Sequence, residues 1–313
     1  MIPAHQHDPA STTPGLADGP TGTALVLGGG GAVGNAWLIG VIAGLDEAGL
    51  HVASADVIIG TSAGATAAAQ LAGATPGELF AAIVDALQET RPSGAGSGRG
   101  AAPARPAANQ LETTSAIIAA AVDAADMRRR LGAWALEKEA TADPAAQARW
   151  RATVAARLPR QTWPERLTLI TAVDAATGDP VVFDRTSGVA LVDAVAASCS
   201  SGFAYRIGDN LYIDGGYRAN ADNADVAAGY ARVLVLSPFG GRSRTPVGWG
   251  THLVTQVDEL RARGSRVETV FPDSHSLTAF GDNMMDLSRR APAARAGHDQ
   301  GRVLAEQLTP SWT

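Results

Sequence analysis

The sequence predicts an α/β fold of three layers, in which a mainly parallel central sheet lies between helices. Short apolar runs without polar alternation recur along the chain, and such runs are typical of strands buried on both faces of a parallel sheet. The first two runs end in glycines and continue as helical patterns, which is the order of βαβ units. With 46% hydrophobic and 18% charged residues among 313, the chain has ample apolar surface for a large core.

Two strand–turn–helix units open the predicted domain. Residues 23–27 form the first apolar run, five glycines follow between Gly28 and Gly34, and residues 36–48 show a helical pattern. Residues 57–59 form the second run, which leads into Gly60-Thr61-Ser62-Ala63-Gly64 and an alanine-rich helix. Consecutive units of this kind place parallel strands side by side with right-handed crossovers.

We expect the segment 91–158 to be an insertion in the alternating strand–helix pattern, because it contains no strand pattern. A capping signal at Thr75-Pro76-Gly77-Glu78 starts a helix that we expect to end near Glu89. Residues 91–108 are rich in glycine and proline, which predicts a flexible linker. Residues 111–158 then read as helical, and we expect them to cover one end of the sheet as a lid or acyl-binding wall.

The rest of the chain returns to alternating strands and helices. Strands are expected at 167–173, 180–183, 211–213, 232–236 and 267–271, and helices at 189–199, 222–229, 248–263, 276–289 and 292–308. We expect residues 23–313 to form a single domain and residues 1–22, which are polar and contain prolines, to be a disordered tail.

Charge and lysine content exclude several function classes. A net charge of −6 provides no broad positive field for nucleic acid. Lys138 is the only lysine, and it lies between two glutamates. P-loop phosphate binding, Schiff-base catalysis and Ser–Lys dyads each require a lysine at a defined place, so the sequence argues against all three.

Cysteine usage and the N-terminal residues indicate a cytoplasmic location. Cys199 is the only cysteine, so it cannot form an internal disulfide, and this favours a reducing compartment. Residues 1–22 lack the apolar core of a signal peptide. No run reaches the roughly 18 to 20 apolar residues that cross a bilayer.

Ser62 is the strongest candidate nucleophile. Residues Gly60 to Gly64 fit the pattern G-x-S-x-G between a strand and a helix, the context in which the pattern forms a nucleophile elbow. Small neighbours allow the sharp turn that exposes the serine hydroxyl, and the N-terminus of the following helix favours developing negative charge.

A serine nucleophile needs a base, and Asp214 is the best candidate. Asp214 follows the apolar strand 211–213 and precedes Gly215 and Gly216. Strand ends of an open parallel sheet meet at one edge, where sites are usually built, so a Ser62–Asp214 dyad is geometrically reasonable. The six histidines lie in the tail, at a helix-to-strand junction or in helical stretches, and none ends a strand: His5, His7, His51, His252, His275 and His298.

The glycine loop Gly28–Gly34 supplies the third element of the site. Without side chains, its backbone amides can face a cleft and bind an oxyanion. The loop also matches G-x-G-x-x-G through Gly29, Gly31 and Gly34, which is a weak signal for dinucleotide binding. The acid that such a site needs at the end of the second strand is missing, because Gly60-Thr61-Ser62 stands there.

Together these motifs resemble the patatin-like phospholipase family over about residues 23–240. The resemblance implies a patatin-like fold and a lipid acyl hydrolase that needs no metal, cofactor or catalytic histidine. It further implies lipid or other acyl-ester substrates and allows transient contact with a membrane surface. By resemblance, Ser62 is the nucleophile, Asp214 is its base, Gly29, Gly30 and Gly31 form the oxyanion hole, and Gly34, Gly60, Gly64, Gly215 and Gly216 support the motifs.

Two positions depart from the family pattern. Val33 stands where the family usually carries arginine or lysine, and residues 197–203 lack the proline-rich character often found before the aspartate strand. Three alternatives stay open: a Ser–His hydrolase with His252 or His275 as base, an acyltransferase or thioesterase that uses the same Ser62, and a degenerate lipid-binding protein without turnover.

Overall fold

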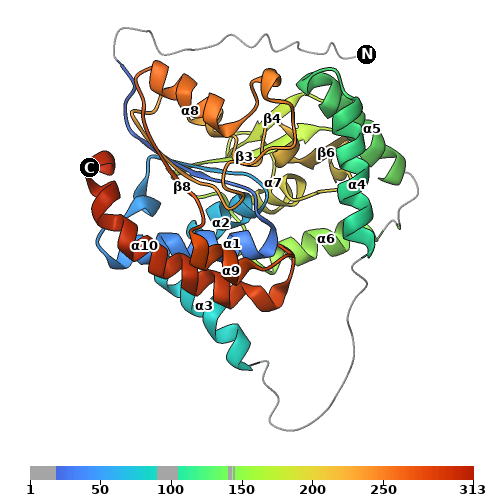
Figure 1. The fold of residues 1–313 in the computed structure, drawn as a ribbon. Helices are drawn as coiled ribbons and strands as arrows, with labels where there is room; N and C mark the ends of the chain where they lie inside the picture. Colours follow the sequence, from blue (N-terminus) through green and yellow to red (C-terminus); the bar gives the residue numbers. More distant parts are fainter. Residues whose placement is uncertain (1–18, 90–104, 140–142, 144) are drawn as a thin grey trace.

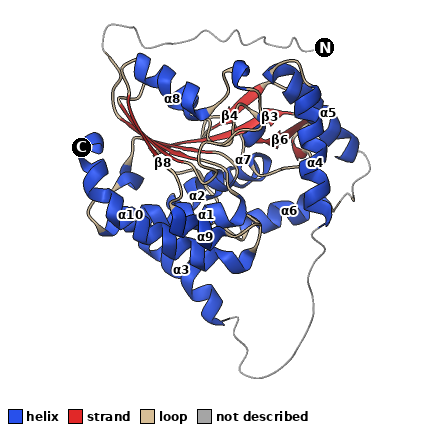
Figure 2. Cartoon of the chain, in the orientation of Figure 1, coloured by secondary structure: helices blue, strands red, loops and turns tan. Residues whose placement is uncertain are grey.

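The computed structural model describes residues 19–89, 105–139, 143 and 145–313, and these residues build a sheet between helices (Figures 1 and 2). Strand order across the sheet is β5-β6-β3-β2-β1-β7-β8, with β4 paired to β3 outside this path. The strands of the described part are β1 Thr23–Leu27, β2 Val57–Gly60, β3 Leu167–Asp174, β4 Pro180–Phe183, β5 Tyr205–Ile207, β6 Asn210–Asp214, β7 Arg232–Leu236 and β8 Arg266–Val270.

Helices cover both faces and one end of the sheet (Figure 1). The α-helices of the described part are α1 Gly31–Glu47, α2 Ala63–Leu71, α3 Pro76–Glu89, α4 Arg105–Ala120, α5 Ala124–Glu139, α6 Ala146–Ala155, α7 Leu191–Ser198, α8 Leu253–Ala262, α9 Ser274–Phe280 and α10 Arg290–Trp312. Short 3₁₀ turns are η1 Val52–Ser54, η2 Gly215–Tyr217, η3 Ala224–Ala227, η4 Val247–Trp249 and η5 Leu287–Arg289.

The central strands bury both of their faces, which confirms the three-layer prediction. In β1, Leu25 and Leu27 belong to the core shared with α1, α2, α7 and α10. The alternate residues Ala24 and Val26 belong to a second core shared with η3 and α8. Successive side chains of a strand point to opposite faces, so the apolar residues 24–27 serve two cores at once.

The sheet changes character at β3. Strands β3, β2, β1, β7 and β8 are parallel, whereas β4 and β6 pair with β3 in antiparallel orientation and β5 pairs with β6. A third core lies at this end, where Met127 and Leu131 of α5 pack against Val173 and Ile213. The predicted insertion therefore covers the antiparallel end of the sheet (Figure 1).

Strand register brings the predicted site residues to one region. Gly60, two residues before Ser62, lies opposite Leu27 of β1 and Ile170 of β3. Asp214 lies opposite Ala172, two residues further along β3. The glycine loop follows Leu27 directly. The ends of β1, β2 and β6 thus place the glycine loop, Ser62 and Asp214 at neighbouring points of the sheet.

Helices α1 and α10 approach each other unusually closely. An added Cβ on Gly40 or Gly44 of α1 would overlap the carbonyl oxygens of Ala294 and His298, and one on Gly301 of α10 would overlap Val41 O. Glycines four residues apart on each helix allow this contact, because they remove the side chains that normally separate two helix backbones. Helix α10 in this way holds the helix that begins at the glycine loop.

Several predicted boundaries differ from the observed ones. The expected helix 222–229 is only the 3₁₀ turn η3, and the residue before it, Asn223, has a left-handed backbone with φ of 53°. The expected helix 276–289 ends at Phe280, because Gly281 adopts φ of 65°. Strand β5 was not predicted. The tail up to residue 18 and the linker residues 91–104 lie outside the described residues. None of the described helices is long and apolar enough to cross a bilayer.

Candidate active site

Ser62 forms a strained turn between β2 and α2. Its backbone has φ of 52° and ψ of −111°, a left-handed conformation that costs a non-glycine residue about 1–3 kcal/mol. An added Cβ on Gly60 would lie 2.6 Å from the Cα of Ala65, and one on Gly64 would overlap Leu27 O. The turn therefore needs both glycines, and its strain presents the half-buried Ser62 side chain at the end of the strand.

The Asp214 carboxylate accepts a hydrogen bond from the Ser62 hydroxyl. Ser62 Oγ donates to Asp214 Oδ2 at 3.0 Å, and the Gly216 amide donates to Asp214 Oδ1 at 2.8 Å. Burial raises the pKa of Asp214 to about 6, while these two hydrogen bonds lower it in part. An Asp carboxyl ordinarily titrates near 4, so Asp214 is a stronger base than a solvated aspartate and is still ionised at neutral pH.

The glycines after Asp214 let the chain turn beside β3. An added Cβ on Gly215 would overlap Thr171 O, and one on Gly216 would lie 3.1 Å from Asp214 Oδ1. Gly215 therefore cannot carry a side chain without moving β3, whereas a side chain at Gly216 would press directly on the Asp214 carboxylate.

Histidines stand apart from this pair in the described part of the chain. His252 Nε2 lies 2.7 Å from Thr245 O, and His298 Nε2 lies 2.8 Å from Glu47 Oε2. His51 contacts Asp46. No hydrogen bond joins any described histidine, His275 included, to Ser62 or Asp214. His5 and His7 lie outside the described residues.

The glycine loop lies directly beside Ser62. An added Cβ on Gly29 would lie 3.7 Å from Ser62 Cβ. The Gly29 amide donates to Ala221 O at 2.7 Å. By contrast, the amides of Gly30 and Gly31, at the N-terminus of α1, have no acceptor among the described residues. Of the three predicted oxyanion donors, Gly30 and Gly31 have amides available in this structure, and Gly29 has one that is already bonded.

Steric contacts explain why the loop is so rich in glycine. An added Cβ on Gly30 would lie 2.6 Å from Pro238 Cβ, and one on Gly34 would lie 2.9 Å from the same atom. Gly31 has φ of 62° and packs against Met284 O. Val33, where the resemblance implies a cation, is fully buried, and its amide donates to Met284 O at 3.0 Å.

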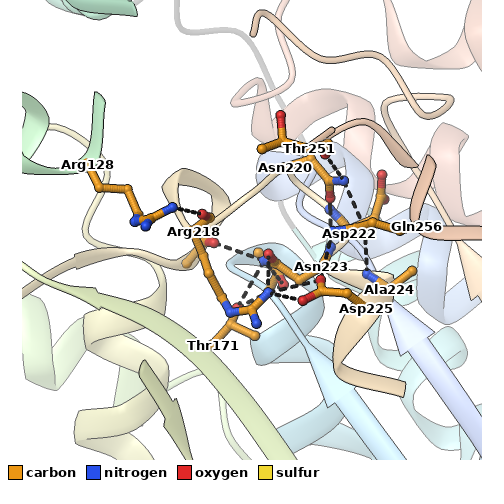
Figure 3. A network of polar contacts seen from close by, with 12 residues as sticks. Arg128, Thr171, Arg218, Asn220, Asp222, Asn223, Ala224, Asp225, Thr251 and Gln256 are labelled. Carbon is orange, nitrogen blue, oxygen red and sulfur yellow. Dashed lines mark hydrogen bonds and ion pairs between the residues drawn. The ribbon is translucent and has the colours of Figure 1, made fainter. Parts of the chain in front are cut away.

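A polar network around Asn223 and Arg218 (Figure 3) reaches the chain neighbours of both candidate residues. Asn223 Nδ2 donates to Thr61 Oγ1 at 3.0 Å and to Gly215 O at 2.9 Å. Thr61 precedes Ser62 and Gly215 follows Asp214, so this one amide links the neighbours of both residues. Arg218 donates to Asn223 Oδ1 and to both oxygens of Asp225. Asn223 is not among the residues predicted from the sequence, where its only signal is a cluster of polar residues at Asn220, Asp222 and Asn223.

The same network contains a second buried carboxyl, Asp222 (Figure 3). Asp222 is 1% exposed, and its Oδ1 packs against the Gly28 backbone without a hydrogen-bond partner among the described residues. Burial raises the pKa of Asp222 to about 7. The backbone amide of Asp222 donates to Asn220 Oδ1 at 2.7 Å. A carboxyl that is partly protonated near neutral pH thus lies behind the start of the glycine loop.

No group of three or more histidine, cysteine or acidic side chains that could hold a metal occurs among the described residues. Within the insertion that was expected to form a lid or acyl-binding wall, Ile118 and Leu131 are buried in the third core, whereas Val122 is 77% exposed.

Comparisons with known proteins relate the chain to solved structures and to a protein family. Among solved structures, VipD from Legionella pneumophila superposes with a TM-score of 0.42 and 14% sequence identity, over 92% of this chain and 67% of that one. The type III effector protein ExoU gives a TM-score of 0.35 and 18% identity over 91% of this chain, which spans only 54% of ExoU. A search of curated proteins found no match. The model of the family described as patatin-like phospholipase matches residues 25–227, and the chain belongs to that family.

Proposed function

We propose that this protein is a serine acyl-ester hydrolase that acts on lipid esters through Ser62 and Asp214. The observation that carries the proposal is the 3.0 Å hydrogen bond from Ser62 Oγ to the buried carboxylate of Asp214. A nucleophile in hydrogen-bond contact with its base, at a strained turn, is the arrangement that acyl transfer requires. Family membership supports a lipid acyl hydrolase in general terms.

The proposed reaction has two halves. Asp214 accepts the Ser62 proton while Oγ attacks the ester carbonyl, and the amides of Gly30 and Gly31 stabilise the resulting oxyanion. The tetrahedral intermediate then collapses, the alcohol leaves with the proton held by Asp214, and an acyl-enzyme forms on Ser62. Water attacks the acyl-enzyme with Asp214 again as base, which releases the carboxylic acid and restores the serine hydroxyl.

Substrate and place of action follow from the same proposal. A lipid ester is held in aggregates, so the enzyme would meet it by transient contact with a membrane surface. We also propose a cytoplasmic enzyme, because Cys199 is a free thiol within the described structure. Transfer of the acyl group to an alcohol or thiol instead of water would use the same acyl-enzyme, and product analysis with and without such an acceptor separates the two reactions.

Hydrolysis of p-nitrophenyl esters of graded chain length tests the proposal. We expect Ser62→Ala and Asp214→Asn to lower kcat by about 10³-fold or more, whereas the exposed-site controls Ser54→Ala and Asp209→Asn stay near wild type. His252→Ala and His275→Ala should also retain activity. If either histidine variant is inactive while Asp214→Asn turns over normally, the base is a histidine. A wild type with no turnover on any ester would favour a lipid-binding protein.

A further inference from the structure

The C-terminal end of α7 and the residue that follows it bond to both backbone groups of Ser62, its amide and its carbonyl. The Ser62 amide donates to Ser198 Oγ at 2.9 Å, and the Cys199 thiol donates to Ser62 O at 3.1 Å. Ser198 and Cys199 are consecutive residues at the C-terminal end of α7, so one short piece of chain fixes the peptide groups on both sides of the Ser62 Cα. Residues 197–203 are also the stretch where the sequence departs from the family pattern.

These hydrogen bonds hold the strained backbone of Ser62. Ser62 holds a positive φ that its own side chain disfavours, so its backbone would relax if the surrounding bonds were lost. Ser198 is fully buried, and replacing its hydroxyl would leave the Ser62 amide without an acceptor. Burial raises the pKa of the Cys199 thiol to about 12, which keeps the thiol protonated as a hydrogen-bond donor.

The next residue connects the segment to the strand of the base. Ser200 is fully buried, and its Oγ lies 3.2 Å from Tyr212 O and 2.6 Å from Ala197 O. Tyr212 belongs to β6, two residues before Asp214. Ser198, Cys199 and Ser200 therefore form a polar bridge from the backbone of Ser62 to the strand that carries Asp214.

We infer that Ser198, Cys199 and Ser200 are positioning residues that set the separation and direction of the Ser62–Asp214 pair. The inference rests on the proposed function, because it assigns the bridge a role in that reaction. None of the three side chains takes part in bond making. Their role is to hold Ser62 Oγ in line with Asp214 Oδ2, and a displacement of about 1 Å at such a pair can cost about 10²-fold in rate.

Ser198→Ala is the first test, with Ser201→Ala as its matched control. Ser201 is exposed and lies 3.2 Å from the Tyr217 hydroxyl instead of contacting Ser62. We expect Ser198→Ala to lower kcat about 10- to 100-fold with KM within twofold, and to slow labelling by a fluorophosphonate probe by the same factor. Ser201→Ala should match wild type in both measurements. Ser198→Ala at the wild-type labelling rate would overturn the inference.

Two variants of Cys199, Cys199→Ala and Cys199→Ser, test the inference if Ser198→Ala fails to fold. Ser62 O also accepts from the Thr66 amide at 3.1 Å, so Cys199→Ala removes one of its donors, whereas Cys199→Ser keeps a side-chain donor of similar size. We expect Cys199→Ala to slow labelling and Cys199→Ser to recover most of the rate, with thermal midpoints of both variants near each other. Equal rates in the two variants would contradict a positioning role. Failure of the proposed function is distinguishable, because Ser62→Ala would then still be labelled or wild type would not be.

Discussion

At the scale of single residues, burial raises the pKa values of two carboxyls in and near the site, Asp214 and Asp222. The pKa of Asp214 is raised to about 6, and Asp214 must be ionised to accept the Ser62 proton. We therefore expect kcat to fall as pH drops through about 6 and to level off above it. A pH profile of ester hydrolysis measures this. A rate that stays constant down to pH 4.5 would show that no carboxyl with a raised pKa acts as the base.

Asp222 is expected to affect stability and its pH dependence. Its pKa is raised to about 7 in the folded chain, whereas an unfolded aspartate ionises near 4. Between these values the folded state holds a proton that the unfolded state has released, so the free energy of unfolding falls as pH rises from about 4 to about 7. Asp222→Asn removes this titration.

Thermal unfolding at pH 5 and pH 8 tests the expectation for Asp222. Wild type should lose more of its thermal midpoint between the two pH values than Asp222→Asn does. The exposed Asp209→Asn serves as control and should follow wild type. The same drop in all three proteins would contradict the assigned burial effect.

At the scale of elements, the close contact of α1 and α10 makes glycine irreplaceable at particular points. An added Cβ on Gly44 would overlap His298 O, whereas one on Gly77 at the start of α3 would meet nothing within 4 Å. We expect Gly44→Ala to lower the free energy of unfolding by about 1–3 kcal/mol, and Gly77→Ala to raise it slightly or leave it unchanged. Denaturant unfolding of both variants measures these changes. An unchanged free energy of unfolding in Gly44→Ala would mean that the two helices are not so closely packed.

Local sequence patterns predict some of the strands and turns but not all of them. Strands β1, β2 and β7 were predicted because an apolar run buried on two faces has few alternative structures. Strand β5 was missed because it has three residues and Arg206 is exposed at its centre. The pattern G-x-S-x-G predicted the elbow at Ser62, since the local turn chemistry lies within five residues.

Contacts between distant segments could not be predicted in the same way. The bonds from Ser198 and Cys199 to Ser62 join residues more than 130 positions apart, and Asn223 reaches Thr61 across 162 positions. A single sequence carries no local signal for these pairs. Equally, only the fold shows that the Gly29 amide is bonded to Ala221 O while the amides of Gly30 and Gly31 have no acceptor in the described chain.

At the scale of the whole molecule, the insertion contributes to stability through the third core. Leu131 of α5 is 1% exposed among residues of β3 and β6. We expect Leu131→Ala to lower the free energy of unfolding by about 2–5 kcal/mol, whereas Val122→Ala, at a 77% exposed position, should change it by less than about 0.5 kcal/mol. Denaturant unfolding measures both. If Leu131→Ala is neutral, α5 does not pack as a structural part of the sheet and a mobile lid becomes the better description.

Covalent labelling of Ser62 is the direct test of whether this serine is the nucleophile. Wild-type protein is incubated with a fluorophosphonate probe, and the modified residue is identified by mass spectrometry of its peptides. If Ser62 and Asp214 are nucleophile and base, we expect one adduct, on Ser62, which disappears in Ser62→Ala and forms much more slowly in Asp214→Asn. Absence of any adduct on wild type, or an adduct that persists in Ser62→Ala, would contradict it.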